Sequence, residues 1–275
     1  MSKTWFITGA SSGLGLEMTE QLLARGDKVV GTARRIGALD SLKQQYGDNL
    51  TVMALELTDT SGIRAAVNDA FRRMGRIDIV VQNAGYGLVG AGEEVSDAEI
   101  DRQLATNLVG SIQLIRAVLP HLRRQGGGRI LQVTSEGGQV AYPNFSIYHA
   151  SKWGVEGFIE AVVQETAPFG IDFIIAEPCA TETGFGANLV HAAPMPEYEN
   201  TPAGEIRRAI TSGSFVLKGD AKRTASAMIA AADEKVAPMR LVLGSTAYES
   251  ISQALARRLT ALEAQRAIAF SADRD

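Results

Sequence analysis

Tyr148 and Lys152 are the two residues whose types and spacing point most directly to chemistry. They stand four positions apart in a segment with helical periodicity, so their side chains are expected on one face of a helix. A phenol has a pKa near ~10, which is too high for efficient proton exchange at neutral pH. A lysine ammonium nearby favours the phenolate and lowers this pKa. The pair therefore predicts a tyrosine that exchanges a proton with a substrate oxygen.

Two further polar residues complete the candidate catalytic set. Ser135 lies just after an expected strand over 128–133, and the carboxyl ends of parallel strands open onto a ligand crevice. Asn107 lies in a long helix expected near 97–123, where its amide would order a water near Lys152. The predicted catalytic residues are Asn107, Ser135, Tyr148 and Lys152.

A glycine-rich turn lies between the first expected strand and the first expected helix. It reads Thr8-Gly9-Ala10-Ser11-Ser12-Gly13-Leu14-Gly15, a Gly-x3-Gly-x-Gly spacing that differs from the common dinucleotide pattern G-x-G-x-x-G. Glycines let the backbone come close to a pyrophosphate. The following helix offers free N–H groups and the positive end of its dipole. The turn predicts a dinucleotide phosphate site with contacts from Gly9, Ser11, Ser12, Gly13, Leu14 and Gly15.

Two arginines, Arg34 and Arg35, follow the second expected strand. Dinucleotide folds read the adenosine ribose at this point, where an acidic residue suits NAD and an arginine suits the 2′-phosphate of NADP. No acidic residue stands here, and an arginine pairs with a phosphate through a charge-assisted fork. The sequence therefore favours NADP(H). The alternative is that both arginines are solvated loop residues.

The elements that must position these residues alternate between short apolar runs and longer helical patterns. Continuous apolar stretches such as 79–81 and 173–175 are typical of strands buried on both faces of a parallel sheet. This alternation predicts an α/β fold, a single-domain Rossmann-type doubly wound parallel sheet of about seven strands with helices on both faces, over 1–275. The expected strands are 4–8, 28–32, 50–55, 77–81, 128–133, 171–176 and 240–243, and the expected helices are 14–25, 63–74, 97–123, 147–168, 220–236 and 247–269.

The segment 183–215 breaks this rhythm because it mixes Gly, Pro and polar residues with large apolar ones. A long irregular stretch inside a compact domain is usually a functional lid or is disordered. We expect a substrate-binding lid at about 183–215, with an inert surface excursion as the alternative. His191, Glu197 and Arg207 could equally face a polar substrate. The apolar residues available to line a substrate site are Phe185, Leu189, Met195, Tyr198 and Phe215.

Together these motifs resemble the short-chain dehydrogenase/reductase family, in its compact single-domain branch, over essentially the whole chain. The matching pieces are the Thr8 to Gly15 turn, Asn83-Ala84-Gly85, Asn107, Ser135, Tyr148-x3-Lys152, and Pro178 with Thr183. The resemblance implies that Tyr148 is the proton donor and acceptor and that Ser135 orients the substrate oxygen. It also implies that Lys152 holds the nicotinamide ribose and tunes Tyr148, while Asn107 keeps a proton-relay water. The cofactor contacts that it adds are Glu56, Leu57, Asn83, Ala84, Gly85, Tyr148, Lys152, Pro178, Thr181 and Thr183.

Three positions depart from the family pattern. Gln82 replaces the first Asn of the usual Asn-Asn-Ala-Gly, which keeps an amide there. Glu56 stands where the family has Asp for the adenine amine, so the carboxylate is kept on a longer arm. Cys179 stands where the family has Gly after Pro178, which brings a side chain near the nicotinamide end. A small packing role is the expectation for Cys179, and a nucleophilic role is the alternative.

The resulting prediction is an NADP(H)-dependent oxidoreductase that interconverts a carbonyl and a secondary alcohol. The alternative is a non-catalytic NADP(H)-binding sensor or regulatory protein on the same fold. Retinoid- or steroid-like substrates, simple ketones and acyl intermediates all remain open. The family resemblance further implies a homodimer or a homotetramer.

Composition argues against several other classes. A formal net charge of −4 gives no sign of a nucleic-acid partner. Cys179 is the only cysteine and the three histidines are far apart, so neither an intrachain disulfide nor a metal site is expected. No apolar run is long enough to cross a bilayer, and the N-terminus reads directly into a strand with no cleavable signal. We expect a cytoplasmic enzyme with a small-molecule substrate.

Overall fold

A parallel sheet of seven strands forms the centre of the computed structural model, which describes residues 2–274. The strand order is β11-β7-β6-β4-β1-β2-β3, so the direction of winding reverses between β1 and β4. In open α/β sheets, ligands bind at the carboxyl ends of the strands beside such a reversal. The predicted doubly wound fold is confirmed. The strands are β1 (Thr4–Thr8), β2 (Lys28–Ala33), β3 (Leu50–Ala54), β4 (Ile79–Gln82), β6 (Gly128–Val133), β7 (Ile171–Pro178) and β11 (Arg240–Leu243).

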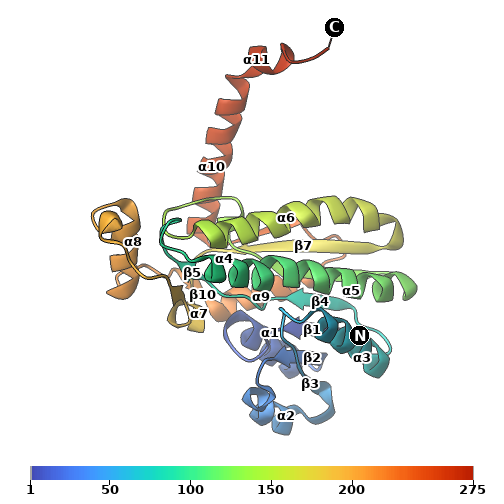
Figure 1. Cartoon of the computed structure of the whole chain (residues 1–275). Helices are drawn as coiled ribbons and strands as arrows, with labels where there is room; N and C mark the ends of the chain where they lie inside the picture. Colours follow the sequence, from blue (N-terminus) through green and yellow to red (C-terminus); the bar gives the residue numbers. More distant parts are fainter. Residues whose placement is uncertain (1, 275) are drawn as a thin grey trace.

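Helices cover both faces of this sheet (Figure 1). One face packs against α1 (Gly13–Ala24) and α9 (Ala221–Asp233), with α2 (Asp40–Tyr46) at the edge. The other face packs against α3 (Thr60–Met74), α5 (Gly110–Arg124) and α6 (Ser146–Thr166). The two helix layers hold the strands in place and so position the residues at the strand ends.

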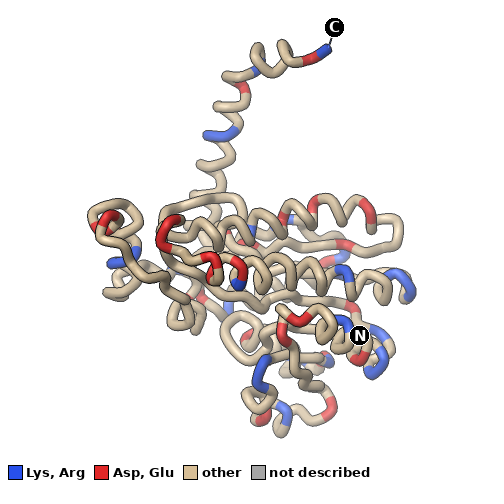
Figure 2. Tube along the Cα trace, viewed as in Figure 1, with Lys and Arg blue, Asp and Glu red and all other residues tan. Residues whose placement is uncertain are grey.

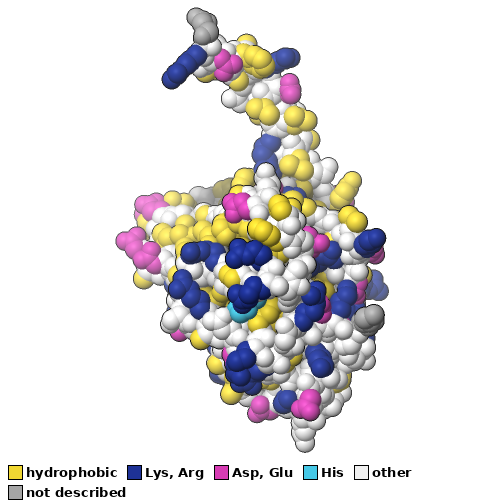
Figure 3. Space-filling model, turned by 90° about the vertical axis from the view of Figure 1, so that its right-hand side faces the viewer, with side chains coloured by type: hydrophobic (Ala, Val, Ile, Leu, Met, Phe, Trp, Pro, Cys, Tyr) yellow, Lys and Arg dark blue, Asp and Glu magenta, His cyan; other side chains and the backbone are white. Residues whose placement is uncertain are grey.

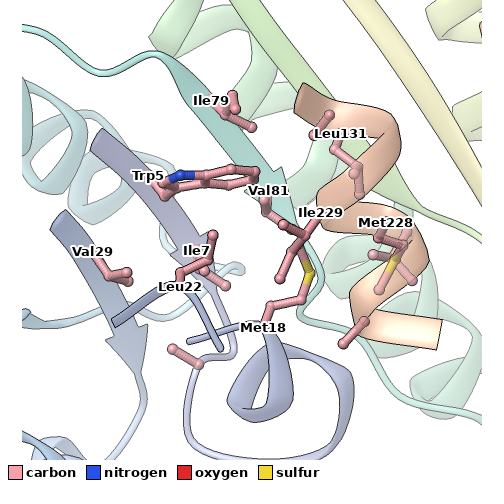
Figure 4. Close-up of a cluster of buried hydrophobic side chains, with 14 of the residues drawn as sticks. Trp5, Ile7, Met18, Leu22, Val29, Ile79, Val81, Leu131, Met228 and Ile229 are labelled. Carbon is pink, nitrogen blue, oxygen red and sulfur yellow. The ribbon is translucent and has the colours of Figure 1, made fainter. Parts of the chain in front are cut away.

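Side chains of one strand enter both cores, which explains the continuous apolar runs. In β1, Trp5 and Ile7 face the α1 and α9 layer, while Phe6 faces the α3 and α5 layer. Figure 4 shows Trp5 and Ile7 beside Met18 of α1 and Met228 of α9. Each fully buried side chain of this kind stabilises the fold by about 1.5–3 kcal/mol.

The helix expected near 97–123 is interrupted in the structure. It consists of α4 (Asp97–Leu104), a π turn (Ala105–Val109) and α5. Ser96 begins α4 with a capping box to Glu99. A π turn keeps the helical direction but shifts the side-chain register, and such turns are frequent at functional sites. Asn107 lies inside it.

The segment 183–215 is more regular than expected. It contains α7 (Gly184–Ala187), β9 (Val190–His191), a short 3-10 turn (Pro196–Tyr198) and α8 (Pro202–Thr211). The strand β9 pairs with β5 (Leu88–Val89), and β8 (Thr181–Glu182) just before the segment pairs with β10 (Gly219–Asp220). Pro202 suits the first turn of α8 because its missing N–H is not needed there. Helix α8 lies at one side of the molecule (Figure 1).

The C-terminal helices leave the body of the molecule. The first turns of α10 (Ser245–Glu263) pack through Ala247, Ile251 and Ala254, and then α10 and α11 (Arg266–Phe270) project away (Figure 1). Hydrophobic side chains lie along this projection (Figure 3). Basic and acidic residues are scattered over all parts of the chain (Figure 2). Among residues 2–274, no helix is long and apolar enough to cross a membrane.

Candidate active site

The helix α6 places Tyr148 and Lys152 on one buried face, as their spacing predicts. The Lys152 Nζ lies 5.6 Å from the centroid of the Tyr148 ring. It donates a hydrogen bond to the carbonyl oxygen of Val133, at the end of β6, over 3.1 Å. The lysine therefore fastens α6 to the carboxyl end of the sheet, where Ser135 also lies.

Ser135 lies close enough to Tyr148 to influence its ionisation. Burial raises the pKa of Tyr148 to about 12, although the Ser135 hydroxyl acts to lower it. Glu136 adds to the increase, and Lys152 does not offset it. The expectation that Lys152 brings this pKa below its ordinary value is therefore wrong for this structure, because the loss of hydration on burial is the largest effect on the phenol.

Lys152 itself is strongly affected by its surroundings. Burial lowers the pKa of Lys152 to about 8, and the carboxylate of Glu156, one helical turn later, acts to raise it. Glu156 is held by Arg240 of β11, with Nη1 and Oε2 2.6 Å apart. Arg240 also pairs with Glu177 of β7. The ammonium of Lys152 is thus close to Glu156, which Arg240 links to Glu177.

Asn107 lies against the loop that follows β4. Its Nδ2 donates to the carbonyl oxygen of Tyr86 over 2.8 Å, and its Oδ1 accepts from the N–H of Tyr86 at 3.2 Å. Its Nδ2 is also 3.5 Å from Oγ of Ser151, the residue before Lys152. The π turn brings this amide to the loop and to α6 at once. Asn107 is therefore in the same cluster as the other three predicted catalytic residues.

The glycine turn is packed so closely that a side chain does not fit at Gly15. A Cβ at Gly15 would lie 2.3 Å from the carbonyl oxygen of Gly9. Gly9 and Gly13 have φ angles of +67° and +53°, in the left-handed region that favours glycine. Ser12 precedes α1 without a side-chain cap, so the first N–H groups of the helix stay available to a phosphate. These features fit a pyrophosphate.

Asn83 and Ala84 lock this turn to β4. Thr8 Oγ1 accepts from the N–H groups of Asn83 and Ala84, at 3.0 Å and 3.1 Å. Asn83 Nδ2 in turn donates to the carbonyl oxygens of Thr8 and Gly9. Gly85 comes next and leaves room for Asn107, whose Oδ1 would lie 3.2 Å from a Cβ there. The segment joins the phosphate turn to the catalytic cluster.

The residues predicted to read the adenosine follow neighbouring strands. Arg34 and Arg35 come directly after β2 and are exposed, and neither forms a salt bridge with any residue in 2–274. Glu56 and Leu57 follow β3, which pairs with β2. Glu56 is exposed, and its Oε1 accepts from the N–H of Thr58 at 3.1 Å. Two unpaired guanidinium groups at this strand edge fit a ribose 2′-phosphate.

At the other end, Pro178 closes β7 and Thr183 lies beside the glycine turn. A Cβ at Gly13 would be 3.5 Å from that of Thr183. Thr181 Oγ1 donates to the carbonyl oxygen of Cys179 over 2.8 Å. The thiol of Cys179 packs against Gly244, where an added Cβ would meet the sulfur at 2.3 Å. Its side chain is thus turned toward the β11–α10 junction, in a packing role.

Apolar side chains surround Tyr148. Val89 and Phe145 are buried with it, and the Phe185 ring is 6.1 Å away, edge-on. Among the apolar residues of the expected lid, Phe185 and Leu189 reach this cluster, whereas the Tyr198 hydroxyl donates to Glu93. Sequence reasoning missed five members of the cluster, which are Val89, Tyr142, Phe145, Ile206 and Ile210. The i, i+4 spacing of the two isoleucines was the available signal.

The position of His149 also could not be predicted from the sequence. Its Nδ1 lies 2.8 Å from the carbonyl oxygen of Gly137, and its Nε2 accepts from the N–H of Tyr142 at 3.2 Å. Burial lowers its pKa, which suits a neutral ring with one donor and one acceptor nitrogen. His149 therefore holds the loop between Ser135 and α6 in place.

This fold and site define an oxidoreductase built on a doubly wound dinucleotide-binding sheet. The sequence model described as short chain dehydrogenase matches residues 3–194, and the chain belongs to that family. No group of three or more His, Cys, Asp or Glu side chains in residues 2–274 is placed to hold a metal ion.

Similar proteins match most of the chain. Oxidoreductase BOA17 of Botryotinia fuckeliana is 34% identical over 92% of this chain and 93% of its own length. The structure of a short-chain dehydrogenase from Streptomyces avermitilis has a TM-score of 0.92 at 36% identity, covering 99% of this chain and 98% of the other. A short chain dehydrogenase from Burkholderia cenocepacia J2315, solved in complex with NADP, has a TM-score of 0.74 at 25% identity, covering 96% and 97%.

Proposed function

We propose that this protein is an NADP(H)-dependent oxidoreductase that interconverts a carbonyl and a secondary alcohol, with Tyr148 as general acid and base. The observation that carries the proposal is the buried cluster in which the Ser135 hydroxyl acts on Tyr148 and the Lys152 Nζ lies 5.6 Å from the centroid of the Tyr148 ring. The cluster lies next to a phosphate-binding turn, so proton and hydride chemistry share one place. A relative of similar fold has been solved with NADP.

NADPH, when bound, supplies the hydride. The Gly9–Gly15 turn and the open N-terminus of α1 bind its pyrophosphate. Arg34 and Arg35 bind the 2′-phosphate, and Glu56 and Leu57 lie at the adenine. Further contacts come from Asn83, Ala84, Gly85, Tyr148, Lys152, Pro178, Thr181 and Thr183.

Tyr148 and Ser135 donate hydrogen bonds to the substrate carbonyl and polarise it. A phenol with a pKa of about 12 is protonated at neutral pH, which suits a proton donor in carbonyl reduction. Lys152 stands close enough to resupply the proton. Asn107 positions the loop and Ser151 beside Lys152, where it holds the relay water.

The chain acts in this proposal as a single catalytic domain, and the segment 183–215 serves as the lid over the substrate. The support is its contact with the Tyr148 cluster through Phe185, Leu189 and α8. The strands β8 and β10 on either side of the segment pair with each other, and β9 within it pairs with β5, which leaves α8 as the part that sets the shape of the substrate site.

The test is a titration with NADPH and with NADH, followed by nicotinamide fluorescence, and then NADPH oxidation with a panel of carbonyl compounds. We expect tight NADPH binding, weaker NADH binding, and turnover with at least one ketone or aldehyde. NADPH binding without turnover across the panel would favour a non-catalytic NADP(H)-binding protein. Failure to bind either cofactor would overturn the proposal.

A further inference from the structure

The part of the site that receives the substrate is built almost entirely from apolar groups. Val89 and Phe145 are buried against Tyr148, and Tyr142 and Leu189 pack on them. Phe185 stands edge-on to the Tyr148 ring and is 41% exposed, so it borders both the phenol and solvent. A substrate that brings its carbonyl to Tyr148 must lay its remaining atoms against these side chains.

The helix α8 supplies the outer side of this apolar cluster. Ile206 and Ile210 are one turn apart on α8, and both pack on the cluster that contains Tyr148. The nearest cation of α8 is Arg207, which sequence reasoning left free to face a polar substrate. The orientation of Arg207 therefore decides whether the site can receive an anion.

Arg207 is committed to another partner. Its Nη1 lies 2.7 Å from Oε1 of Glu94, whose side chain is 0% exposed, and its Nη2 lies 3.5 Å from Glu199. Glu94 also accepts from the N–H groups of Ala91 and Met195, each at 2.8 Å. A buried carboxylate with these three donors does not release its arginine readily, since an uncompensated buried charge is costly. The pair thus fixes α8 to the loop after β5.

The other arginine of the segment is also paired. Arg208 Nη1 lies 2.6 Å from Oε1 of Glu199, on the exposed side of α8. On the inner side, the buried Glu136 acts on Tyr148 as a negative charge. Neither arginine of 183–215 is therefore available to a substrate carboxylate, and Glu136 repels one.

We infer that the substrate is a carbonyl compound with a bulky, uncharged apolar group, and that the Glu94–Arg207 pair sets this preference by holding Ile206 and Ile210 beside Tyr148. Arg207 and Glu94 are positioning residues, because they act through α8. This inference rests on the proposed function, which it narrows to one substrate class. Burying a carboxylate here, with Arg207 and Arg208 already paired and Lys152 bonded to the carbonyl oxygen of Val133, would cost far more than the apolar contacts return.

The test compares two matched ketones, acetonaphthone and the same ketone carrying a ring carboxylate, with cyclohexanone as a small reference. With NADPH and the wild-type protein, we expect kcat/KM for acetonaphthone to exceed that for its carboxylate by at least about a hundredfold. Equal rates, or a preference for the carboxylate, would overturn the inference and leave the proposed function standing. Reduction of none of the three would count against both, and the NADPH titration then separates loss of the cofactor site from loss of catalysis.

The variant Arg207→Met tests the positioning role. It should raise KM for acetonaphthone about tenfold while kcat for cyclohexanone and the Kd for NADPH stay within about twofold. The matched control is Arg208→Met, the neighbouring arginine with an exposed partner. It should leave the KM, the kcat and the Kd unchanged because exposed pairs contribute little. Equal effects of the two variants, or a general loss of NADPH binding in Arg207→Met, would contradict a role through α8.

The variant Ile210→Arg tests the charge argument without breaking the ion pair. Placing an unpaired cation at the edge of the apolar cluster should reduce discrimination against the carboxylate at least about tenfold. Circular dichroism and NADPH affinity show that the variant is folded. Unchanged discrimination in a folded variant would show that α8 does not contact the substrate and would overturn the inference.

Discussion

The phosphate turn and α8 border the same site but are built in different ways. The turn is held by backbone groups and short side chains, with the side chains of Thr8 and Asn83 bonded to peptide groups of Thr8, Gly9, Asn83 and Ala84. The helix α8 is held by side chains, above all by the Glu94–Arg207 pair. A two-residue pairing of β5 with β9 is the nearby backbone link.

This difference bears on both function and evolution of specificity. A site built from backbone leaves little choice of residue type, because an added Cβ at Gly15 collides with a carbonyl. A site built from side chains can change its substrate with one or two substitutions while its frame stays intact. Changes in the turn should therefore remove cofactor binding, and changes in α8 should alter substrate choice alone.

The largest effect on cofactor binding is expected from Gly15→Ala, which tests the backbone-built region. The methyl group would lie 2.3 Å from the Gly9 oxygen and 2.5 Å from Asn83 Nδ2, so the turn must open. We expect NADPH affinity to fall by about a hundredfold, or about 2.7 kcal/mol, as measured by fluorescence titration. Gly157→Ala is the control, because nothing lies within 4 Å of a Cβ there. A folded Gly15→Ala protein with unchanged affinity would contradict the packing described for the turn.

A smaller effect is expected when Arg34 and Arg35 are both changed to Ala. Both guanidinium groups are exposed, so solvent screening reduces their combined contribution to about 2 kcal/mol, and NADPH affinity should fall by about thirtyfold while NADH affinity stays the same. Arg72→Ala, at the end of α3, serves as an exposed arginine control. Equal losses for both cofactors would mean that the arginines support the fold and do not read the phosphate.

A pH shift is expected from Glu156→Gln. The carboxylate of Glu156 acts to raise the pKa of Lys152, which burial holds at about 8. Removing its charge should lower this pKa further, so Lys152 loses its proton at lower pH and the alkaline fall of kcat moves to lower pH. Activity should drop several-fold above pH about 8 and little below pH about 7. Glu160→Gln, which removes an exposed partner of the same Arg240, is the control and should leave the profile in place.

The smallest effect is expected from Cys179→Ala. The thiol packs on Gly244, so its loss should cost about 1 kcal/mol in the free energy of unfolding. Turnover and NADPH affinity should change less than about twofold, because the side chain is turned away from the site. A tenfold change in turnover with unchanged stability would place Cys179 at the nicotinamide instead.

The strands and helices of the central sheet could be predicted because they depend on the pattern of apolar residues within each segment. Strand β1 reads as an apolar run since Trp5, Ile7 and Phe6 are buried on both faces. The four predicted catalytic residues stay predictions, and their motif order and spacing led to them: Ser135 follows β6, Tyr148 and Lys152 share one face of α6, and Asn107 lies in the long helix before β6. Expected strand ends differ from the observed ones by one or two residues, as in β3 and β4.

Other features depend on contacts that no local pattern contains. Glu94 and Arg207 are 113 residues apart in the chain, so their pairing appears only once the fold is known. The π turn at Asn107 has nearly the same apolar periodicity as an unbroken helix. Whether the pKa of Tyr148 is raised or lowered depends on how deeply the phenol is buried, which the Tyr-x3-Lys spacing does not reveal. The homo-oligomer and the cytoplasmic location stay predictions.

The most direct test of the central claim is the variant Tyr148→Phe, measured for NADPH binding and for carbonyl turnover in parallel. It removes one hydroxyl from a ring that stays packed among Phe145, Phe185 and His149. We expect NADPH affinity within about twofold of wild type and turnover reduced by at least about a thousandfold. Retained turnover in this variant would show that another group handles the proton and would contradict the account.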